Sequence, residues 1–317
     1  MRLHSSSWLL AAVVPFMAAA QNPSPVSQEP PTFRSDTRLV VLPVTVADKT
    51  GKLIPNLPQT AFKVFENGSE QPIKSFHRED VPVSLGIIID NSGSMRDKRI
   101  KVETASADLV KASNHQDEVF VVNFNDEAYL DVPFTNDIKK LEAGLARIDS
   151  RGGTAMRDAI SMSIDYMKES GKKDKKVILV VTDGNDTAST GTLEKLVAKA
   201  QKGEVIVYAI GLLNEEERRE ARKAKRALDE LTSASGGLAY YPKDLTDVDK
   251  IALQVAHEIR NQYTITYTPT IQALDGSFRQ IKVTVSGAGR NTLVRTRTGY
   301  YATPDTESKT ASLSPLH

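Results

Sequence analysis

The stretch Leu85-Gly86-Ile87-Ile88-Ile89-Asp90-Asn91-Ser92-Gly93-Ser94-Met95 decides the fold of this chain. Its first residues form a continuous apolar run that is too short to cross a membrane, which is typical of a central parallel strand covered on both faces. The strand ends in a carboxylate and two hydroxyls at alternate positions around a glycine: Asp90, Ser92 and Ser94. In open α/β sheets, ligands collect beyond the carboxyl ends of strands, so the turn predicts an oxygen-rich binding loop.

Oxygen-only donors suit a hard cation such as Mg2+, but this turn offers too few of them to fill a coordination shell. Two later stretches could supply more: the Gly-rich loop 151–154 ending in Thr154, and the buried strand 177–182 followed by Asp183 and Gly184. Each also has a purely structural interpretation, because Thr154 could cap the helix that starts at Ala155 and Asp183 could open a turn. The occurrence of all three pieces after suitable elements favours a metal site.

The order DxSxS, then GGT, then TDG resembles the metal-ion-dependent adhesion site of the von Willebrand factor type A domain. Five residues carry the match: Asp90, Ser92, Ser94, Thr154 and Asp183. The resemblance implies that both serines, and in some states the threonine, contact Mg2+ (or Mn2+ or Ca2+) directly. It also implies that the aspartates act through water and that a partner carboxylate completes the shell. Neutral hydroxyl ligands leave a cation electrophilic, which suits such a role.

The resemblance covers about residues 83–260, where expected strands and helices alternate. This pattern predicts an α/β fold with a doubly wound, mostly parallel sheet and helices on both faces, as in Rossmann-like folds. In the expected helix 97–113, Ile100, Val102, Ala105 and Leu109 should face inward. Strand 128–134 should follow a hairpin and lie antiparallel at the sheet edge. Further helices are expected at 136–148, 155–169, 192–202, from Asn214 and at 245–260.

Two β-rich segments, 38–82 and 261–302, flank this region. The first should contain a hairpin in which Asn67-Gly68 joins strands 62–66 and 73–76. The second should contain strands 262–267, 278–285 and 292–301. Neither segment is large enough to be stable alone, so we expect them to form one small β-sandwich-like domain with residues 83–260 inserted. Two independent β appendages are the alternative.

The ends of the chain predict export. Residues 1–20 combine basic Arg2 with a short apolar core and a terminal Ala18-Ala19-Ala20, the pattern of a secretory signal peptide. Residues 21–37 read as a linker and 303–317 as a disordered tail. No stable membrane span is expected after signal cleavage, so the mature protein should be secreted or periplasmic. The absence of cysteine excludes disulfides and thiolate metal sites.

Charge and motifs narrow the function further. With 41 basic and 40 acidic residues, the chain gives no electrostatic argument for nucleic acid. The basic run 218–226 contains acids at helical spacing, such as Glu220 with Lys223, which favours a solvated face. The five histidines show no ligand spacing, and GxSxG, HExxH and Walker motifs are absent.

We therefore expect a non-enzymatic, divalent-metal-dependent protein-binding module of the adhesion type. Its partner should be a protein that supplies an Asp or Glu carboxylate to the metal. Asn91, Met95, Arg157 and the residues after Asp183 are expected to shape the partner surface. The alternatives are a metal-assisted hydrolase, in which an aspartate acts as base, and a structural component of an envelope assembly.

Overall fold

The computed structural model describes residues 39–78, 80–146, 150–213, 218–289 and 292–303. The predicted signal peptide 1–20, the linker 21–37, and residues 304–317 of the predicted tail lie outside the described residues. So does the predicted helix start at Asn214. Among the helices that the structure describes, none combines the length and the apolar character needed to cross a bilayer.

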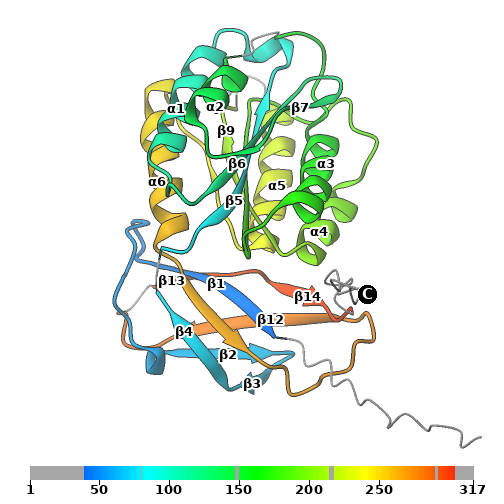
Figure 1. Ribbon diagram of the computed structural model, residues 1–317. Coiled ribbons are helices and arrows are strands. Elements are labelled where there is room, and N and C mark those ends of the chain that lie inside the picture. Colours follow the sequence, from blue (N-terminus) through cyan, green and yellow to red (C-terminus); the bar gives the residue numbers. More distant parts are fainter. Residues whose placement is uncertain (1–38, 79, 147–149, 214–217, 290–291, 304–317) are drawn as a thin grey trace, which may run out of the picture. The chain divides into compact units, whose positions relative to one another are not determined.

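A six-stranded sheet forms the centre of the upper module in Figure 1, in the order β10-β9-β8-β5-β6-β7. All neighbouring strands are parallel except β7, which pairs antiparallel with β6 at the edge, as predicted. The strand bounds are β5 Val83–Asp90, β6 Glu118–Phe124, β7 Ala128–Thr135, β8 Lys175–Thr182, β9 Val205–Gly211 and β10 Ala239–Tyr240.

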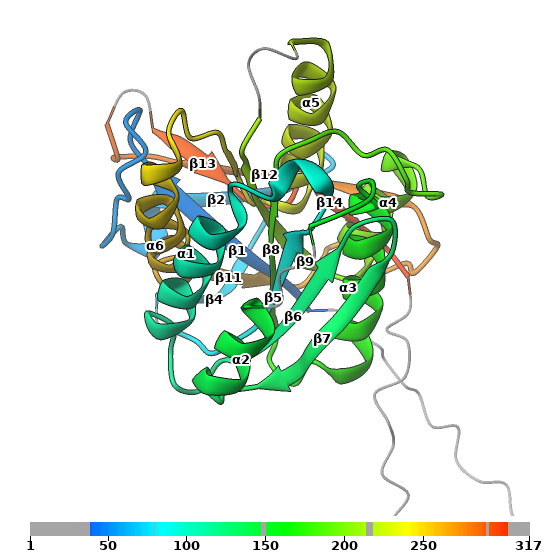
Figure 2. The same cartoon turned by 90° about the horizontal axis from the view of Figure 1, so that it is seen from above.

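Helices cover both faces of this sheet (Figure 2). Ile87 and Ile89 of β5 pack with α1, α2 and α6, whereas Ile88 packs with α3, α4 and α5. Burial on both faces explains why the strand is continuously apolar rather than alternating. The bounds are α1 Arg99–Lys111, α2 Ile138–Leu145, α3 Met156–Ser170, α4 Leu193–Lys202, α5 Arg218–Ser235 and α6 Val248–Arg260, with 3-10 turns at η1 Gln59–Ala61, η2 Gly93–Met95 and η3 Leu245–Asp247.

The prediction that Ile100 faces inward is wrong. Its side chain is 70% exposed, while Val102, Ala105 and Leu109 are buried as expected. Residues two apart on a helix point in widely different directions, so Ile100 and Val102 cannot share a face. The buried position in the first turn belongs instead to Arg99.

The lower module in Figure 1 consists of two antiparallel four-stranded sheets, β13-β1-β11-β4 and β14-β12-β2-β3. Both sheets contain strands from both flanking segments, and side chains of both enter one apolar cluster. The fold class predicted from the sequence is therefore confirmed, while the domain limits 38–82, 83–260 and 261–302 stay a prediction. The strand bounds are β1 Val40–Ala47, β2 Phe62–Glu66, β3 Ser69–Gln71, β4 Ile73–His77, β11 Tyr263–Tyr267, β12 Phe278–Val285, β13 Leu293–Arg295 and β14 Gly299–Tyr301.

Two strand predictions in this module are wrong in detail. Asn67 and Gly68, with φ of 48° and 84°, form a two-residue turn that joins β2 to β3, so the predicted partner strand, β4, lies in the other sheet. Positive φ at both turn residues is what a tight hairpin requires. Residues 292–301 do not form one strand either, because the chain passes between the sheets after β13 and continues as β14. At this crossing, buried Arg297 pairs with Glu204 at 2.9 Å.

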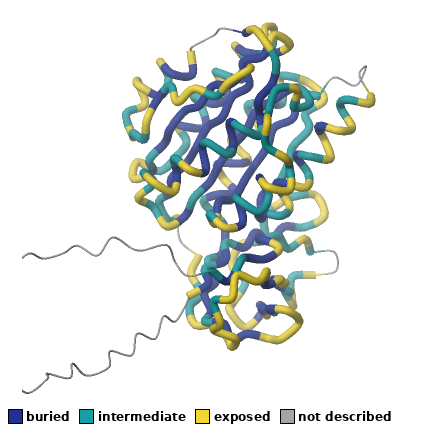
Figure 3. The backbone as a smooth tube through the Cα atoms, turned by 90° about the vertical axis from the view of Figure 1, so that its right-hand side faces the viewer, coloured by how far each residue is buried: buried dark blue, intermediate teal, exposed yellow. Residues whose placement is uncertain are grey.

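The two modules meet at buried polar side chains. Glu258 of α6, 2% exposed, accepts hydrogen bonds from Tyr208 of β9 at 2.8 Å and from Thr45 of β1 at 3.2 Å. Arg295 of β13 forms an ion pair with the same carboxylate. Figure 3 shows buried backbone in the centre of each module and exposed backbone around it.

Candidate metal site

The first loop of the candidate site begins at the carboxyl end of β5. Asp90 is fully buried there; its Oδ1 accepts the backbone N–H of Ser92 at 2.8 Å, and its Oδ2 accepts the hydroxyl of Thr182 at 2.6 Å. Burial raises the pKa of Asp90 to about 6, against the lowering effect of these hydrogen bonds. One carboxylate oxygen thus holds the loop after β5, and the other holds the end of β5 against its neighbour β8.

The hydroxyls of the first loop converge on the third loop. The Oγ atoms of Ser92 and Ser94 lie 3.1 Å apart, and the Ser94 hydroxyl donates to Oδ1 of Asp183 at 2.8 Å. The ammonium of Lys98 donates to the other oxygen, Oδ2, at 2.5 Å. Hydrogen bonding therefore connects Ser94 in the first loop directly to Asp183 in the third loop, 89 positions later in the sequence.

Thr154 lies on a second loop that is fastened to the other two. Its N–H donates to the Thr187 hydroxyl at 3.0 Å, and its carbonyl accepts from the N–H groups of Thr187 and Ala188. On the other side, the Gly93 N–H donates to the carbonyl of Gly152 at 3.3 Å. Thr154 is not the helix cap, because Ala155 holds the N-cap position of α3.

The glycines of the second loop leave room for a carboxylate. Gly152 has φ of 73°, and a Cβ atom there would lie 2.1 Å from Oδ2 of Asp126. The neighbouring N–H of Gly153 donates to Oδ1 of Asp126 at 2.7 Å. Asp126 lies in the β6–β7 hairpin and thus holds the GGT loop through its backbone, a role that its position in a turn does not predict.

Arg99 is hydrogen-bonded to the first loop from the interior of the protein. It is fully buried, and its Nε donates to Oδ1 of Asn91 at 3.2 Å while its Nη2 donates to Oδ1 of Asn123 and to the carbonyl of Leu145, both at 2.8 Å. Burial lowers the pKa of this guanidinium, and the charges of Glu103, Asp131 and Asp90 act in the opposite direction. The side chain ties the first loop to β6 and to the end of α2.

The expected partner surface needs correction at two positions. Asn91 and Met95 are buried, with Met95 in the apolar core, so neither can line an exposed rim. Arg157 is partly exposed and pairs with Asp186 at 3.2 Å. The exposed residues beside the site include Gly93, Ser94, Arg96, Asp97, Asp126, Arg151 and Gly152.

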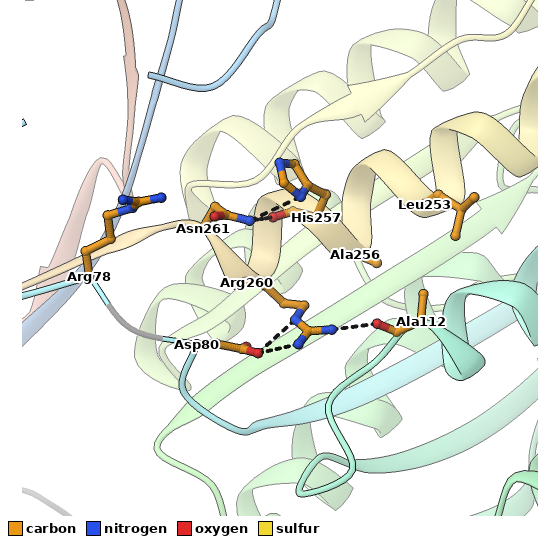
Figure 4. Close-up of a pocket in the computed structure, with 8 residues that line it drawn as sticks. All are labelled: Arg78, Asp80, Ala112, Leu253, Ala256, His257, Arg260 and Asn261. Carbon is orange, nitrogen blue, oxygen red and sulfur yellow. Dashed lines mark hydrogen bonds and ion pairs between the residues drawn. The ribbon is translucent and has the colours of Figure 1, made fainter. Parts of the chain in front are cut away.

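Within the described residues, no cluster of three or more His, Asp or Glu side chains is arranged to hold a metal. The predicted site would not form such a cluster, since three of its five donors are hydroxyls. His257 lies far along α6, beside a hollow of about 590 Å³ shown in Figure 4. There Arg260 donates to Asp80 at 2.9 Å and to the Ala112 carbonyl at 2.7 Å, at the amino end of β5 rather than the carboxyl end.

Residues 85–185 match the family model of the von Willebrand factor type A domain. Within this range the chain is similar to that domain. The matched range includes all five predicted ligand positions, and it runs from within β5 through β6, β7 and β8.

Two curated proteins are similar to part of this chain. It is 23% identical over 144 residues to inter-alpha-trypsin inhibitor heavy chain H4 of Sus scrofa, covering 41% of this chain and 16% of the relative. It is 29% identical over 110 residues to integrin alpha-11 of Mus musculus, covering 33% of this chain and 9% of the relative. The chain thus spans less than a fifth of the length of either relative.

Several solved structures are also similar to this chain. A von Willebrand factor type A protein from Catenulispora acidiphila superimposes with a TM-score of 0.48 at 13% identity, covering 83% of this chain and 75% of the other. BatB from Bacteroides thetaiotaomicron gives 0.46 at 20% identity, covering 56% and 98%. The PilB minor pilin from Streptococcus sanguinis gives 0.46 at 15% identity, covering 60% and 63%.

Proposed function

We propose that this von Willebrand factor type A protein is a non-enzymatic, divalent-metal-dependent protein-binding module. In this proposal Ser92, Ser94 and Thr154 hold Mg2+ (or Mn2+ or Ca2+), and Asp90 and Asp183 orient the hydroxyls and bound waters. The observation that carries the proposal is the hydrogen-bonded chain from Ser92 through Ser94 to Asp183 at the carboxyl edge of the sheet.

The chemistry of these residues fits a hard cation. All five side chains present oxygen, and the three loops that carry them are connected by direct hydrogen bonds. When bound, the cation would offer its remaining coordination positions to an anionic oxygen. With hydroxyls as the nearest ligands, the donor set brings less negative charge to the cation than a set of direct carboxylates would.

A partner with an Asp or Glu carboxylate is the natural counterpart of such a site. Exposed Arg96 and Arg151 beside the loops support this choice, because positive side chains around a binding point favour the approach of an acidic group. Export through cleavage of residues 1–20, with a secreted or periplasmic location, is part of the same proposal.

Calorimetry with Mg2+ and Mn2+ tests the function directly. The wild-type protein should bind the metal, and a peptide with a single glutamate should bind only in its presence. Ser94→Ala should weaken metal binding by more than about tenfold. Ser233→Ala is a matched control, because Ser233 is exposed on α5, outside the three loops, and donates to the Asp229 carbonyl.

The outcomes separate the functions. If wild-type protein binds neither metal, with or without the peptide, the metal-dependent module is wrong. If metal binding is accompanied by turnover of a hydrolysable substrate that is lost in Asp183→Ala, the hydrolase interpretation replaces it. Binding that is equal in wild type and Ser94→Ala would place the metal elsewhere.

A further inference from the structure

Lys98 contacts the candidate site, although no motif in the sequence marks it. Its ammonium lies 2.5 Å from Oδ2 of Asp183, whose side chain is 1% exposed, and the Lys98 side chain is itself only 25% exposed. The opposite oxygen of the same carboxylate accepts the Ser94 hydroxyl at 2.8 Å. Asp183 is therefore shared between a metal-loop hydroxyl and a cation of the protein.

The position of Lys98 is fixed by the helix that follows. Its carbonyl accepts hydrogen bonds from Lys101 and Val102, so it forms the first turn of α1, and its own N–H donates to the carbonyl of Met95 at 2.9 Å. Because Met95 is buried in the core, the backbone of Lys98 is held close to the metal loop. The Lys98 side chain therefore starts within reach of Asp183.

We propose that Lys98 is a built-in counter-cation of the site, which weakens divalent-metal binding and strengthens binding of an anionic partner group. This inference rests on the proposed function. The ammonium competes for the negative charge of Asp183, so a divalent cation nearby is attracted less strongly. Once the cation is bound, the same positive charge adds to the field that attracts a carboxylate.

The two effects have opposite signs, and this distinguishes an electrostatic role from a structural one. A residue that only positions Asp183 would, when removed, weaken both metal and carboxylate binding. Removing a counter-cation would instead strengthen metal binding and weaken carboxylate binding. The charge effect should also shrink as salt is added, because the Lys98 side chain is partly exposed and ionic screening reduces such interactions.

The experiment compares Lys98→Met, Lys98→Arg and Lys101→Met by calorimetry in the full chain. Lys98→Met should bind Mg2+ about tenfold more tightly, because the change removes a positive charge that competes with the cation for Asp183. Its Mg2+-loaded form should bind the glutamate peptide several-fold more weakly than wild type. Lys98→Arg keeps the charge and should resemble wild type.

Lys101→Met controls for the loss of a lysine from the same helix, because Lys101 pairs with Asp249 outside the site. Thermal unfolding of each variant without metal shows whether the fold is kept. The inference is overturned if Lys98→Met has the wild-type affinities for Mg2+ and for the glutamate peptide, or if it loses both. In either case the proposed function still stands as long as the wild-type protein binds Mg2+ and the peptide. If no variant and no wild-type protein binds Mg2+, the proposed function fails and the inference falls with it.

Discussion

Replacing Glu258 by glutamine should destabilise the chain far more than neutralising a surface carboxylate. One oxygen of Glu258 accepts from Tyr208, Thr45 and Arg295, and the other accepts from Tyr240 at 3.1 Å. Glutamine keeps the shape but leaves the Arg295 guanidinium, 20% exposed, without its counter-charge. Removing one partner of a buried pair costs about 3–5 kcal/mol, and partial exposure of Arg295 argues for the lower end, about 3 kcal/mol.

Urea unfolding followed by circular dichroism measures this loss. Glu70→Gln is the matched control, because Glu70 pairs with Lys63 at 3.1 Å and both side chains are more than half exposed. That change should cost no more than about 1 kcal/mol. A double-mutant cycle of Glu258→Gln with Arg295→Met should give a coupling energy above about 1 kcal/mol. Equal losses in Glu258→Gln and Glu70→Gln would refute the reasoning from burial.

Three further predictions follow from buried groups. Burial lowers the pKa of Lys175 from 10.5 to about 8, so between these pH values the unfolded chain binds more protons, and stability should rise by up to about 1.4 kcal/mol per pH unit. Gly86→Ala should cost about 1–3 kcal/mol, because the new Cβ would lie 2.5 Å from the Phe120 ring. Arg99→Met should remove one of the hydrogen bonds that hold the Asn91 side chain and lower Mg2+ affinity by more than about tenfold.

Each of these has its own test. Unfolding free energies of wild type and Lys175→Met, measured from pH 7.5 to 10, should diverge with rising pH; parallel curves would contradict the assignment. Phe120→Leu should relieve the cost of Gly86→Ala, and an unrelieved loss would locate the strain elsewhere. For Arg99→Met, calorimetry that gives wild-type metal affinity in a folded variant would remove this arginine from the support of the loop.

The sequence predicts the order of elements in the α/β module well because its signals are local. A continuous apolar run such as 85–89 can only be buried on both faces, and loops that follow parallel strands must meet at one edge. These two facts are enough to predict that Asp90, Ser94 and Asp183 lie near one another. The hydrogen bonding that connects them depends on side-chain geometry, which no sequence pattern specifies.

The residues that sequence patterns miss make direct contacts with residues far away in the sequence. Arg99 stands in a charged run that looks like a solvated helix start, yet it is fully buried because three polar acceptors from separate elements surround it. Thr182 looks like an ordinary strand residue, but its hydroxyl donates to Asp90. In the β module, β3 is only three residues long and polar, so alternation gives no signal for it and the predicted hairpin has the wrong partner strand.

The contacts of Asp90 indicate that its carboxylate and the hydroxyl groups have different roles in the proposed site. Both of its oxygens already accept hydrogen bonds, from Ser92 and from Thr182, and the side chain is fully buried. Direct coordination that displaced either donor would leave a buried group unpaired, which costs about 1–3 kcal/mol. Contact through a water molecule would keep both. Ser94 is exposed and meets no such cost, and this difference supports its hydroxyl, rather than Asp90, as a group that would face the metal.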